Sequence, residues 1–342
     1  MKKQPATRPS VSMASPLIHL AIGTLLVSPV LAQPCTPAPS GLVGWWSGDG
    51  NGIDLAGTNS VSLSRGATYG SGLVGRAFSF SGGPDVVQSA VGSRLASLQN
   101  TFTVEFWALP AVDRLSTREQ SGGSNGIGGQ RYAITPEWGG QAAAGVGVSV
   151  GRNGVSVFEH GDAYMPSVVV YDAVISGWTH IAVVYQNRLP SLYINGVLAR
   201  TGLTGSRSVV YPSILFGNVP DAPQYGPYVG LLDEVCVYNR ALSATEIQAI
   251  HQAGNGGKCG KPAYTIALYP NSFPDLYAGL TISGLQGHSY GVQCTTNLFN
   301  PGSWIGVTNL TLAESPLVWH ASERATGAQK YYRVLHGPVP VP

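Results

Sequence analysis

Two places in the chain bring acidic side chains close together: Glu159 and Asp162, which flank His160, and the adjacent pair Asp233 and Glu234. Cleavage of a glycosidic bond needs two carboxyl groups that face one cleft about 5–10 Å apart. Successive side chains of a β-strand point to opposite faces, so neither an adjacent pair nor a pair three residues apart supplies this arrangement on one strand. The sequence therefore predicts a protein that is not an enzyme.

Two other patterns associated with catalysis or metal binding lead to the same result. Gly147-Val-Ser-Val-Gly151 matches the G-x-S-x-G pattern, but a nucleophile there needs a turn from a strand into a helix. Both flanks of this segment predict strands, so Ser149 is not expected to be a nucleophile. The histidines and cysteines lack the H-x-x-x-H and C-x-x-C spacings of zinc sites.

Aromatic side chains in predicted loops are the remaining candidates for ligand binding. An exposed aromatic face can stack on a sugar ring or anchor a protein partner. The segment Gly154–Tyr171 combines an aromatic residue, a histidine and two acids in a loop-rich setting. We predict that Trp138, His160 and Tyr164 bind the ligand. The alternative for any single aromatic residue of this kind is that it fills a small core beneath a loop. That alternative extends to other loop aromatics, namely Tyr211, Tyr225 and Tyr228.

The elements that must position these residues are predicted to be strands. The 342 residues include 45 Gly and 24 Pro, and only 11% are charged, which favours strands and turns. Phe102–Ala108 alternates, with Phe102, Val104, Phe106 and Ala108 on one face. Asn195-Gly196 between two apolar runs predicts a hairpin. One helix is expected after Ser243, because Ser243 and Glu246 form a capping box.

The N-terminus predicts export. Residues 1–32 combine a basic start with the apolar run Pro16–Ala32, which is too short and too interrupted by proline for a comfortable membrane span, and end at a small-residue cleavage site. We therefore expect a secreted or cell-surface protein without a membrane span after cleavage. The mature chain has 16 basic and 17 acidic residues, so nucleic acid is not an expected partner.

The four cysteines allow three pairings, and export permits disulfides. Cys35 and Cys259 bracket the large β-rich region and lie outside its strands, as expected for a bridge that ties its two ends. We predict that these two are paired. Cys236 lies within a predicted strand, where it can act as a small buried apolar residue. Cys294 lies in the following domain.

Composition and turn residues divide the exported chain into two all-β domains. The second is expected to contain about seven short strands, which suggests a small β-sandwich of immunoglobulin or fibronectin-III type. The predicted parts are a Pro-rich lead-in (33–41), a large β domain (42–256), a linker (257–262), the small β-sandwich (263–336) and a tail (337–342).

Several motifs occur in an order and spacing that resemble a known family. They are Gly41–Asn51 (GLVGWWSGDGN), Gly75–Gly82 (GRAFSFSG), Phe102–Trp107 (FTVEFW), Gly177–Ala182 (GWTHIA), Leu192–Gly196 (LYING) and Leu231–Ile250 (LLDEVCVYNRALSATEIQAI). Over residues 42–251 the chain resembles the laminin-G-like jellyroll domains of the concanavalin A-like lectin/glucanase superfamily. The C-terminal segment resembles a β-sandwich appended to many bacterial secreted proteins.

This resemblance implies a concanavalin A-like jellyroll sandwich that acts as a non-catalytic recognition module, binding a glycan or an extracellular or surface protein. Such a fold hosts several functions, so two alternatives stay open: a structural or adhesive building block and a carbohydrate-active enzyme. The resemblance also implies a structural Ca²⁺ ion. Asp233 and Gly82 fall at family ligand positions, with Asp85 as a nearby carboxylate. Pro84 stands where the family usually has a second acid.

Overall fold

The computed structural model describes residues 35–89, 95, 97–218, 225–259, 263–272, 275–284, 287–297, 300–313, 317–324 and 330–342. The predicted signal sequence (1–32), the start of the lead-in and the end of the linker lie outside the described residues. Within the described residues, no helix has the length and apolarity needed to cross a membrane.

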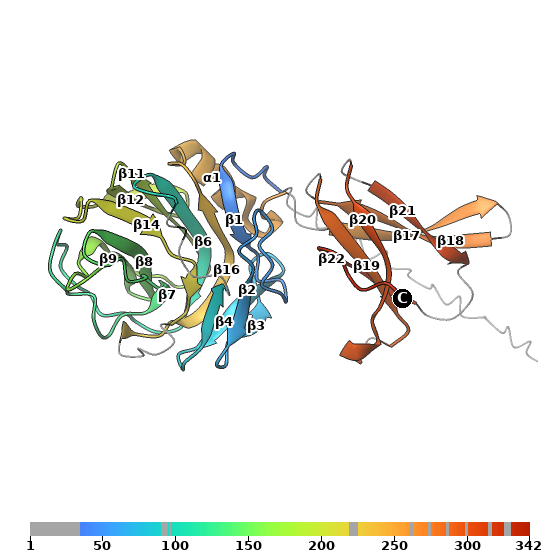
Figure 1. Ribbon diagram of the computed structural model, residues 1–342, viewed down its shortest axis with the longest axis horizontal. Helices are drawn as coiled ribbons and strands as arrows, with labels where there is room; N and C mark the ends of the chain where they lie inside the picture. Colours follow the sequence, from blue (N-terminus) through green and yellow to red (C-terminus); the bar gives the residue numbers. More distant parts are fainter. Residues whose placement is uncertain are drawn as a thin grey trace, which may run out of the picture. The chain divides into compact units, whose positions relative to one another are not determined.

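Two large sheets build the N-terminal domain (Figure 1). The first sheet has the order β13-β12-β11-β6-β16-β4-β3, and β1 also pairs with β16. Its strands are β1 (Leu42–Trp46), β3 (Thr68–Ser71), β4 (Arg76–Ser81), β6 (Phe102–Pro110), β11 (Thr179–Gln186), β12 (Leu189–Ile194), β13 (Val197–Thr201) and β16 (Val229–Tyr238).

The second sheet has the order β10-β9-β8-β7-β15-β5-β2, and β14 pairs with β8 in parallel. Its strands are β2 (Val61–Ser64), β5 (Val86–Ser89), β7 (Tyr132–Ile134), β8 (Ala143–Gly151), β9 (Gly154–His160), β10 (Ser167–Asp172), β14 (Val209–Pro212) and β15 (Leu215–Phe216). The predicted jellyroll architecture of two large sheets is therefore confirmed.

The main core lies between the two sheets. The face of β6 that carries Phe102, Val104, Phe106 and Ala108 contributes to it, as the alternation predicts. The opposite face of β6 carries Thr103, Glu105 and Trp107, all of them buried as well. Burial on both faces requires a cover on the outer side of the first sheet.

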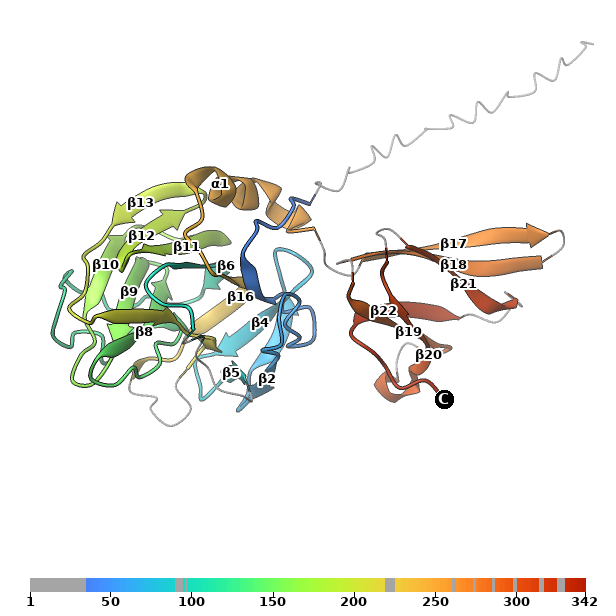
Figure 2. The same ribbon diagram turned by 45° about the horizontal axis from the view of Figure 1, so that its top comes forward.

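That cover is the predicted helix, α1 (Ala244–Ala253) (Figure 2). The capping box is present: the Ser243 hydroxyl accepts from the Glu246 amide at 3.3 Å, and the Glu246 carboxylate accepts from the Ser243 amide at 2.9 Å. Ile247 and Ile250 pack in a second cluster with Trp45, which also contains Cys236 and Tyr238 of β16. A short 3-10 turn (Gly254–Gly256) follows.

The C-terminal domain has two three-stranded sheets, β17-β18-β21 and β20-β19-β22. The strands are β17 (Ala263–Ser272), β18 (Asp275–Ser283), β19 (Ser289–Thr295), β20 (Ile305–Thr311), β21 (Leu317–Arg324) and β22 (Tyr331–His336). One core joins the two sheets, for example through Ile282 of β18 and Val292 of β19. Two predicted short strands form the single strand β20, which pairs with β19 through one register shift. The immunoglobulin or fibronectin-III identity stays a prediction.

Candidate functional site

The three residues predicted to bind the ligand come together at loops that connect strands of the second sheet. Trp138, His160 and Tyr164 line one hollow of about 190 Å³. A second hollow of about 190 Å³ is also lined by Trp138 and His160. The two hollows share four residues, so we treat them as one feature, the aromatic cleft. Its shared residues are Trp138, His160, Met165 and Tyr225.

Two loops form the cleft because hydrogen bonds join them. The first connects β7 to β8 and contains Trp138, and the second connects β9 to β10 after His160. The amide of Gly139 donates to His160 O at 3.0 Å, and the amide of Asp162 donates to Gly140 O at 2.8 Å. A Cβ at Gly139 would lie 2.4 Å from Ala143 O, so this close approach of backbones requires glycine.

Trp138 offers the open surface of the cleft, since 56% of the residue is exposed. Met165 is buried in a small cluster with Tyr132 and Phe158, against which Tyr225 packs. The Tyr225 ring centroid lies 5.7 Å from that of His160. Sequence reasoning did not select Met165, because its burial depends on the path of the loops and on no local pattern.

His160 is held in one tautomer. Its Nδ1 lies 3.1 Å from the carbonyl oxygen of Pro136, which can only accept a hydrogen bond, so Nδ1 carries the proton. Burial lowers the pKa of His160, and the contact with Pro136 offsets this only in part. At neutral pH the ring is therefore uncharged, and Nε2 is a hydrogen-bond acceptor.

Tyr164 forms a wall of the cleft and is itself buried, with 5% exposed. Its hydroxyl donates to Glu159 Oε2 at 2.8 Å and accepts from the Ser206 amide at 3.1 Å. The guanidinium of Arg207 lies over its ring at 4.7 Å. The buried Glu159 also accepts from Tyr185 at 3.2 Å. Burial raises the pKa of Glu159 to about 7, because the two phenols compensate its charge only in part.

A second polar cluster lies on the outer face of the first sheet and is fully buried. Glu105 Oε2 is 3.0 Å from His180 Nε2, and Glu105 Oε1 is 3.0 Å from Lys258 Nζ. Lys258 also lies 3.4 Å from Glu234. Burial alone would raise the pKa of Glu105, but Lys258 and His180 outweigh it and lower this pKa to about 2. We call these four residues the ion cluster. Because it is closed to solvent, it is a structural feature.

Sequence reasoning missed the ion cluster, although the outward position of Glu105 followed from the alternation of β6. Asp233 and Glu234 do not follow the predicted alternation to opposite faces, because β16 shifts register against β6 between Asp233 and Cys236. Asp233 accepts from the Val74 amide at 2.8 Å, whereas Glu234 faces Lys258. Glu234 has a φ of 57°, at the bulge where β16 shifts register against β6.

The residues predicted to bind calcium are not gathered at one point. The buried Asp85 accepts from the amide and the hydroxyl of Ser81, the residue before Gly82. Ser81 pairs with Val229, four residues before Asp233 on β16. That separation is about 13 Å along a strand, whereas calcium ligands lie about 2.3–2.6 Å from the ion. Among the residues that the structure describes, no three or more His, Cys, Asp or Glu side chains form a group that could hold a metal.

The predicted disulfide is present: Cys35 and Cys259 are bonded, with their Cα atoms 5.0 Å apart. Cys236 and Cys294 are buried thiols. The bridge closes the N-terminal domain, and the backbone beside it pairs Thr36 with Lys258. It therefore holds Lys258, a member of the ion cluster, near the start of the domain.

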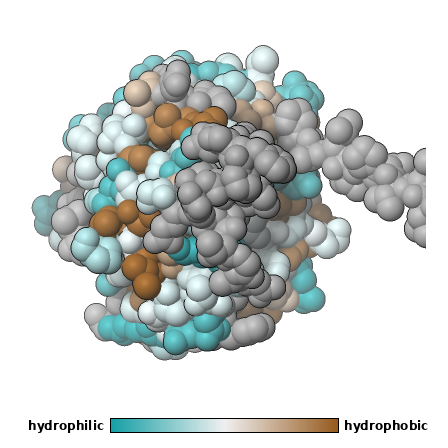
Figure 3. All heavy atoms as spheres, turned by 90° about the vertical axis from the view of Figure 1, so that its right-hand side faces the viewer, coloured by the Kyte–Doolittle hydropathy of each residue, from teal (hydrophilic) through white to brown (hydrophobic). Residues whose placement is uncertain are grey.

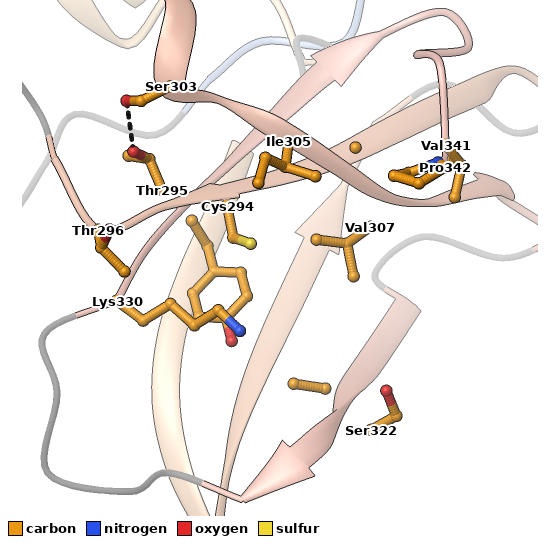
Figure 4. A pocket seen from close by; sticks show the side chains of 13 residues that line it. Cys294, Thr295, Thr296, Ser303, Ile305, Val307, Ser322, Lys330, Val341 and Pro342 are labelled. Atoms are coloured by element: carbon orange, nitrogen blue, oxygen red, sulfur yellow. Dashed lines mark hydrogen bonds between the residues drawn. The ribbon is translucent and has the colours of Figure 1, made fainter. Parts of the chain in front are cut away.

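The C-terminal domain contains a larger hollow, of about 450 Å³ (Figure 4). Thr295 and Ser303 are hydrogen-bonded at 2.7 Å on its wall, and Cys294, Val307 and Lys330 also line it. Among the described residues that line this hollow there is no tryptophan to offer an open aromatic face. The coloured part of the face drawn in Figure 3 carries apolar residues in small separate patches among polar ones. Among these features, the aromatic cleft has the clearest character of a binding site.

Comparison with known proteins identifies the N-terminal domain. Residues 81–248 match the family described as the concanavalin A-like lectin/glucanases superfamily. None of the curated proteins matches the chain.

Among solved structures, domain 4 of AbnA, an extracellular arabinanase from Geobacillus stearothermophilus crystallised with arabinotriose, is 18% identical. The match covers 60% of this chain and 96% of that one, with a TM-score of 0.42. The binding domain of botulinum neurotoxin DC with rat synaptotagmin II is 12% identical over 85% of this chain and 73% of that one, with a TM-score of 0.45. Trypanosoma rangeli sialidase is 20% identical over 65% of this chain and 36% of that one, with a TM-score of 0.43. Similarity at this level says nothing about the ligand of this chain.

Proposed function

We propose, from the premise that this chain carries a laminin-G-like domain of the concanavalin A-like lectin/glucanase superfamily, that it is a non-catalytic recognition module. The ligand is a glycan or an extracellular or surface protein, and it binds in the aromatic cleft. The observation that carries the proposal is the exposed Trp138 ring beside Tyr225 and His160. Open aromatic faces next to a few polar groups are typical of such sites.

Export to an oxidising compartment is part of the proposal. It is supported by the disulfide, because such bonds persist in secreted and surface proteins. The absence of enzymatic activity is also a proposal. It is supported by the surroundings of the buried carboxylates, since Glu105 faces Lys258 and Glu159 faces two phenols.

The test is binding of an array of neutral and acidic oligosaccharides to the chain from Gln33 to Pro342, followed by calorimetry on any glycan that binds. We expect Trp138→Ala to weaken binding by about tenfold or more. Truncation of an aromatic anchor typically costs about 2 kcal/mol of binding free energy. The matched control is Leu115→Ala, which removes a side chain that is 51% exposed and does not line the cleft. Equal binding by wild type and Trp138→Ala would contradict the proposal.

A structural Ca²⁺ ion remains a separate proposal, with Asp233, Asp85 and Gly82 as candidate ligands. Because Asp233 and Asp85 do not lie close together, only one of the two carboxylates could coordinate a given Ca²⁺ ion. Thermal melts with millimolar Ca²⁺ and with EDTA test it, on wild type, Asp233→Ala and Asp85→Ala. A higher Tm with Ca²⁺ that one variant abolishes would support a site at that carboxylate. Identical melts with Ca²⁺ and EDTA would remove calcium from the proposal.

A further inference from the structure

We infer that the aromatic cleft binds a neutral rather than an anionic saccharide and that His160 accepts a hydrogen bond from a ligand hydroxyl. This inference rests on the proposed function and narrows its ligand class. It follows from three features of the cleft: the tautomer of His160, the charges that line the walls and the open ring of Trp138.

The first feature is the free acceptor. Because Nδ1 of His160 donates to Pro136 O, the second nitrogen of the neutral ring can only accept. His160 lines both hollows, so a ligand in either of them lies beside this ring. A ligand that satisfies Nε2 must bring a donor. A sugar hydroxyl is such a donor, whereas a quaternary ammonium group or an ionised carboxylate has none to offer.

The second feature is the charge of the walls. Among the described residues that line the two hollows there is no lysine or arginine, and Glu137 is acidic. The nearby Arg207 lies over the Tyr164 ring, and its guanidinium already donates to the carbonyls of Gln141 and Asp162. An anionic sugar would therefore lose water without gaining a cation, which opposes its binding.

The third feature is the geometry of the apolar surface. Trp138 is exposed and Tyr225 lies across from His160, so a flat apolar face and a hydrogen-bond acceptor meet within the same cleft. A pyranose or furanose ring has this combination of an apolar face and edge hydroxyls. Aromatic walls without an acceptor would equally suit a quaternary ammonium group, which has no donor for Nε2, so His160 favours a ligand that carries hydroxyl groups.

The test uses matched pairs of defined probes with the chain from Gln33 to Pro342. The pairs are galactotetraose with tetragalacturonate, and lactose with sialyllactose. We expect the neutral member of a pair to bind at least about tenfold more tightly than its charged partner. Full O-methylation of a bound neutral sugar removes its hydrogen-bond donors and should weaken its binding by about tenfold.

Two variants isolate the acceptor. His160→Phe keeps a ring next to Tyr225 and removes the acceptor, and we expect it to weaken a bound neutral sugar by about tenfold. His160→Gln retains an acceptor oxygen and should stay within about threefold of wild type. Melting temperatures of both variants serve as the folding control.

The outcomes separate this inference from the proposed function. If a sugar binds through Trp138 but His160→Phe binds it as tightly as wild type, the inference fails and the recognition function stands. Preferential binding of the acidic probes overturns the inference in the same way. If no saccharide probe binds the wild-type chain, the inference is wrong, whereas recognition of a protein ligand in the aromatic cleft still stands.

Discussion

Glu105 and Glu159 are two glutamates that are equally buried, in strands of opposite sheets, yet they meet opposite surroundings. Glu105 is held by Lys258 and His180, each at 3.0 Å, and its pKa is lowered to about 2. Glu159 receives hydrogen bonds from two tyrosines, and burial raises its pKa to about 7. Burial alone therefore does not set the ionisation of a carboxyl group, because its partners decide it.

The two sites should also respond to pH in opposite directions. The folded-state pKa of Glu105 lies below its usual 4.5, so its stabilising contribution is present above about pH 4.5 and is lost as the pH falls toward about 2. The folded-state pKa of Glu159 lies above 4.5, so its contribution is present below about pH 4.5 and is lost as the pH rises through about 7.

The largest expected effect comes from breaking the Glu105 side of the comparison. Lys258→Met leaves Glu105 and Glu234 buried without their shared cation, and we expect the free energy of unfolding to fall by about 3–5 kcal/mol. Urea denaturation near neutral pH measures it. The control is Arg152→Met, because Arg152 pairs with Asp113 on the surface and should contribute less than about 1 kcal/mol. Equal losses in the two variants would show that the ion cluster does not form.

Removing the disulfide should have the next largest effect. Cys35→Ser combined with Cys259→Ser opens a loop closed over a sequence separation of 224 residues, and we expect a loss of about 2–5 kcal/mol. Because Lys258 adjoins Cys259, removal of the disulfide should weaken the Glu105 site. It should leave unchanged the pH dependence of stability near pH 7, which comes from Glu159. Denaturation at about pH 5.5 and about pH 8.5 tests this. If the free energy of unfolding differed between the two pH values by another amount than in wild type, this expectation would be contradicted.

The variant Glu159→Gln tests the contribution of Glu159 to the pH dependence of stability. Wild type should lose about 2–3 kcal/mol of stability between about pH 5 and about pH 8.5, because Glu159 ionises in its buried site. The glutamine variant keeps the shape of the side chain without this titration, so that part of the pH dependence should disappear. Denaturant midpoints across this range measure it. An unchanged slope in Glu159→Gln would assign the titration to another group.

The smallest expected effect is that of Tyr164→Phe. The ring stays in the cleft wall, but the donor to Glu159 Oε2 is lost, which should cost about 1 kcal/mol above pH 7. The loss of this donor raises the Glu159 pKa further, so the upper end of the pH range over which stability declines should move upward. A double variant with Glu159→Gln is the matched control, and in it the upward movement should vanish.

Much of the fold was predictable because it follows from local patterns. The alternation of Phe102–Ala108 fixed which face of β6 enters the core, and the Ser243–Glu246 pair located α1. Trp138, His160 and Tyr164 could be selected as loop residues, and they do line one hollow. Tyr211 and Tyr228 looked similar in sequence, but both are buried, as the alternative for loop aromatics anticipated.

The partners of buried charges could not be predicted. Glu105, His180 and Lys258 come from β6, β11 and the segment after α1, and only the strand register brings them together. The tautomer of His160 depends in the same way on the backbone carbonyl of Pro136. No periodicity in the sequence reports such contacts, because they are set by the tertiary path of the chain.

The position of the disulfide also has a mechanical consequence. Cys35 and Cys259 stand at the two ends of the jellyroll with their Cα atoms 5.0 Å apart. A pulling force that enters through the N-terminal lead-in and leaves through the C-terminal domain passes across the sulfur bridge, so it bypasses every strand between them. The bridge thereby prevents extension of the chain between the two cysteines, which has a contour length of roughly 750 Å. The aromatic cleft lies inside this bypassed loop. Tension on the chain therefore does not act on the cleft and should change neither its shape nor its affinity for a ligand.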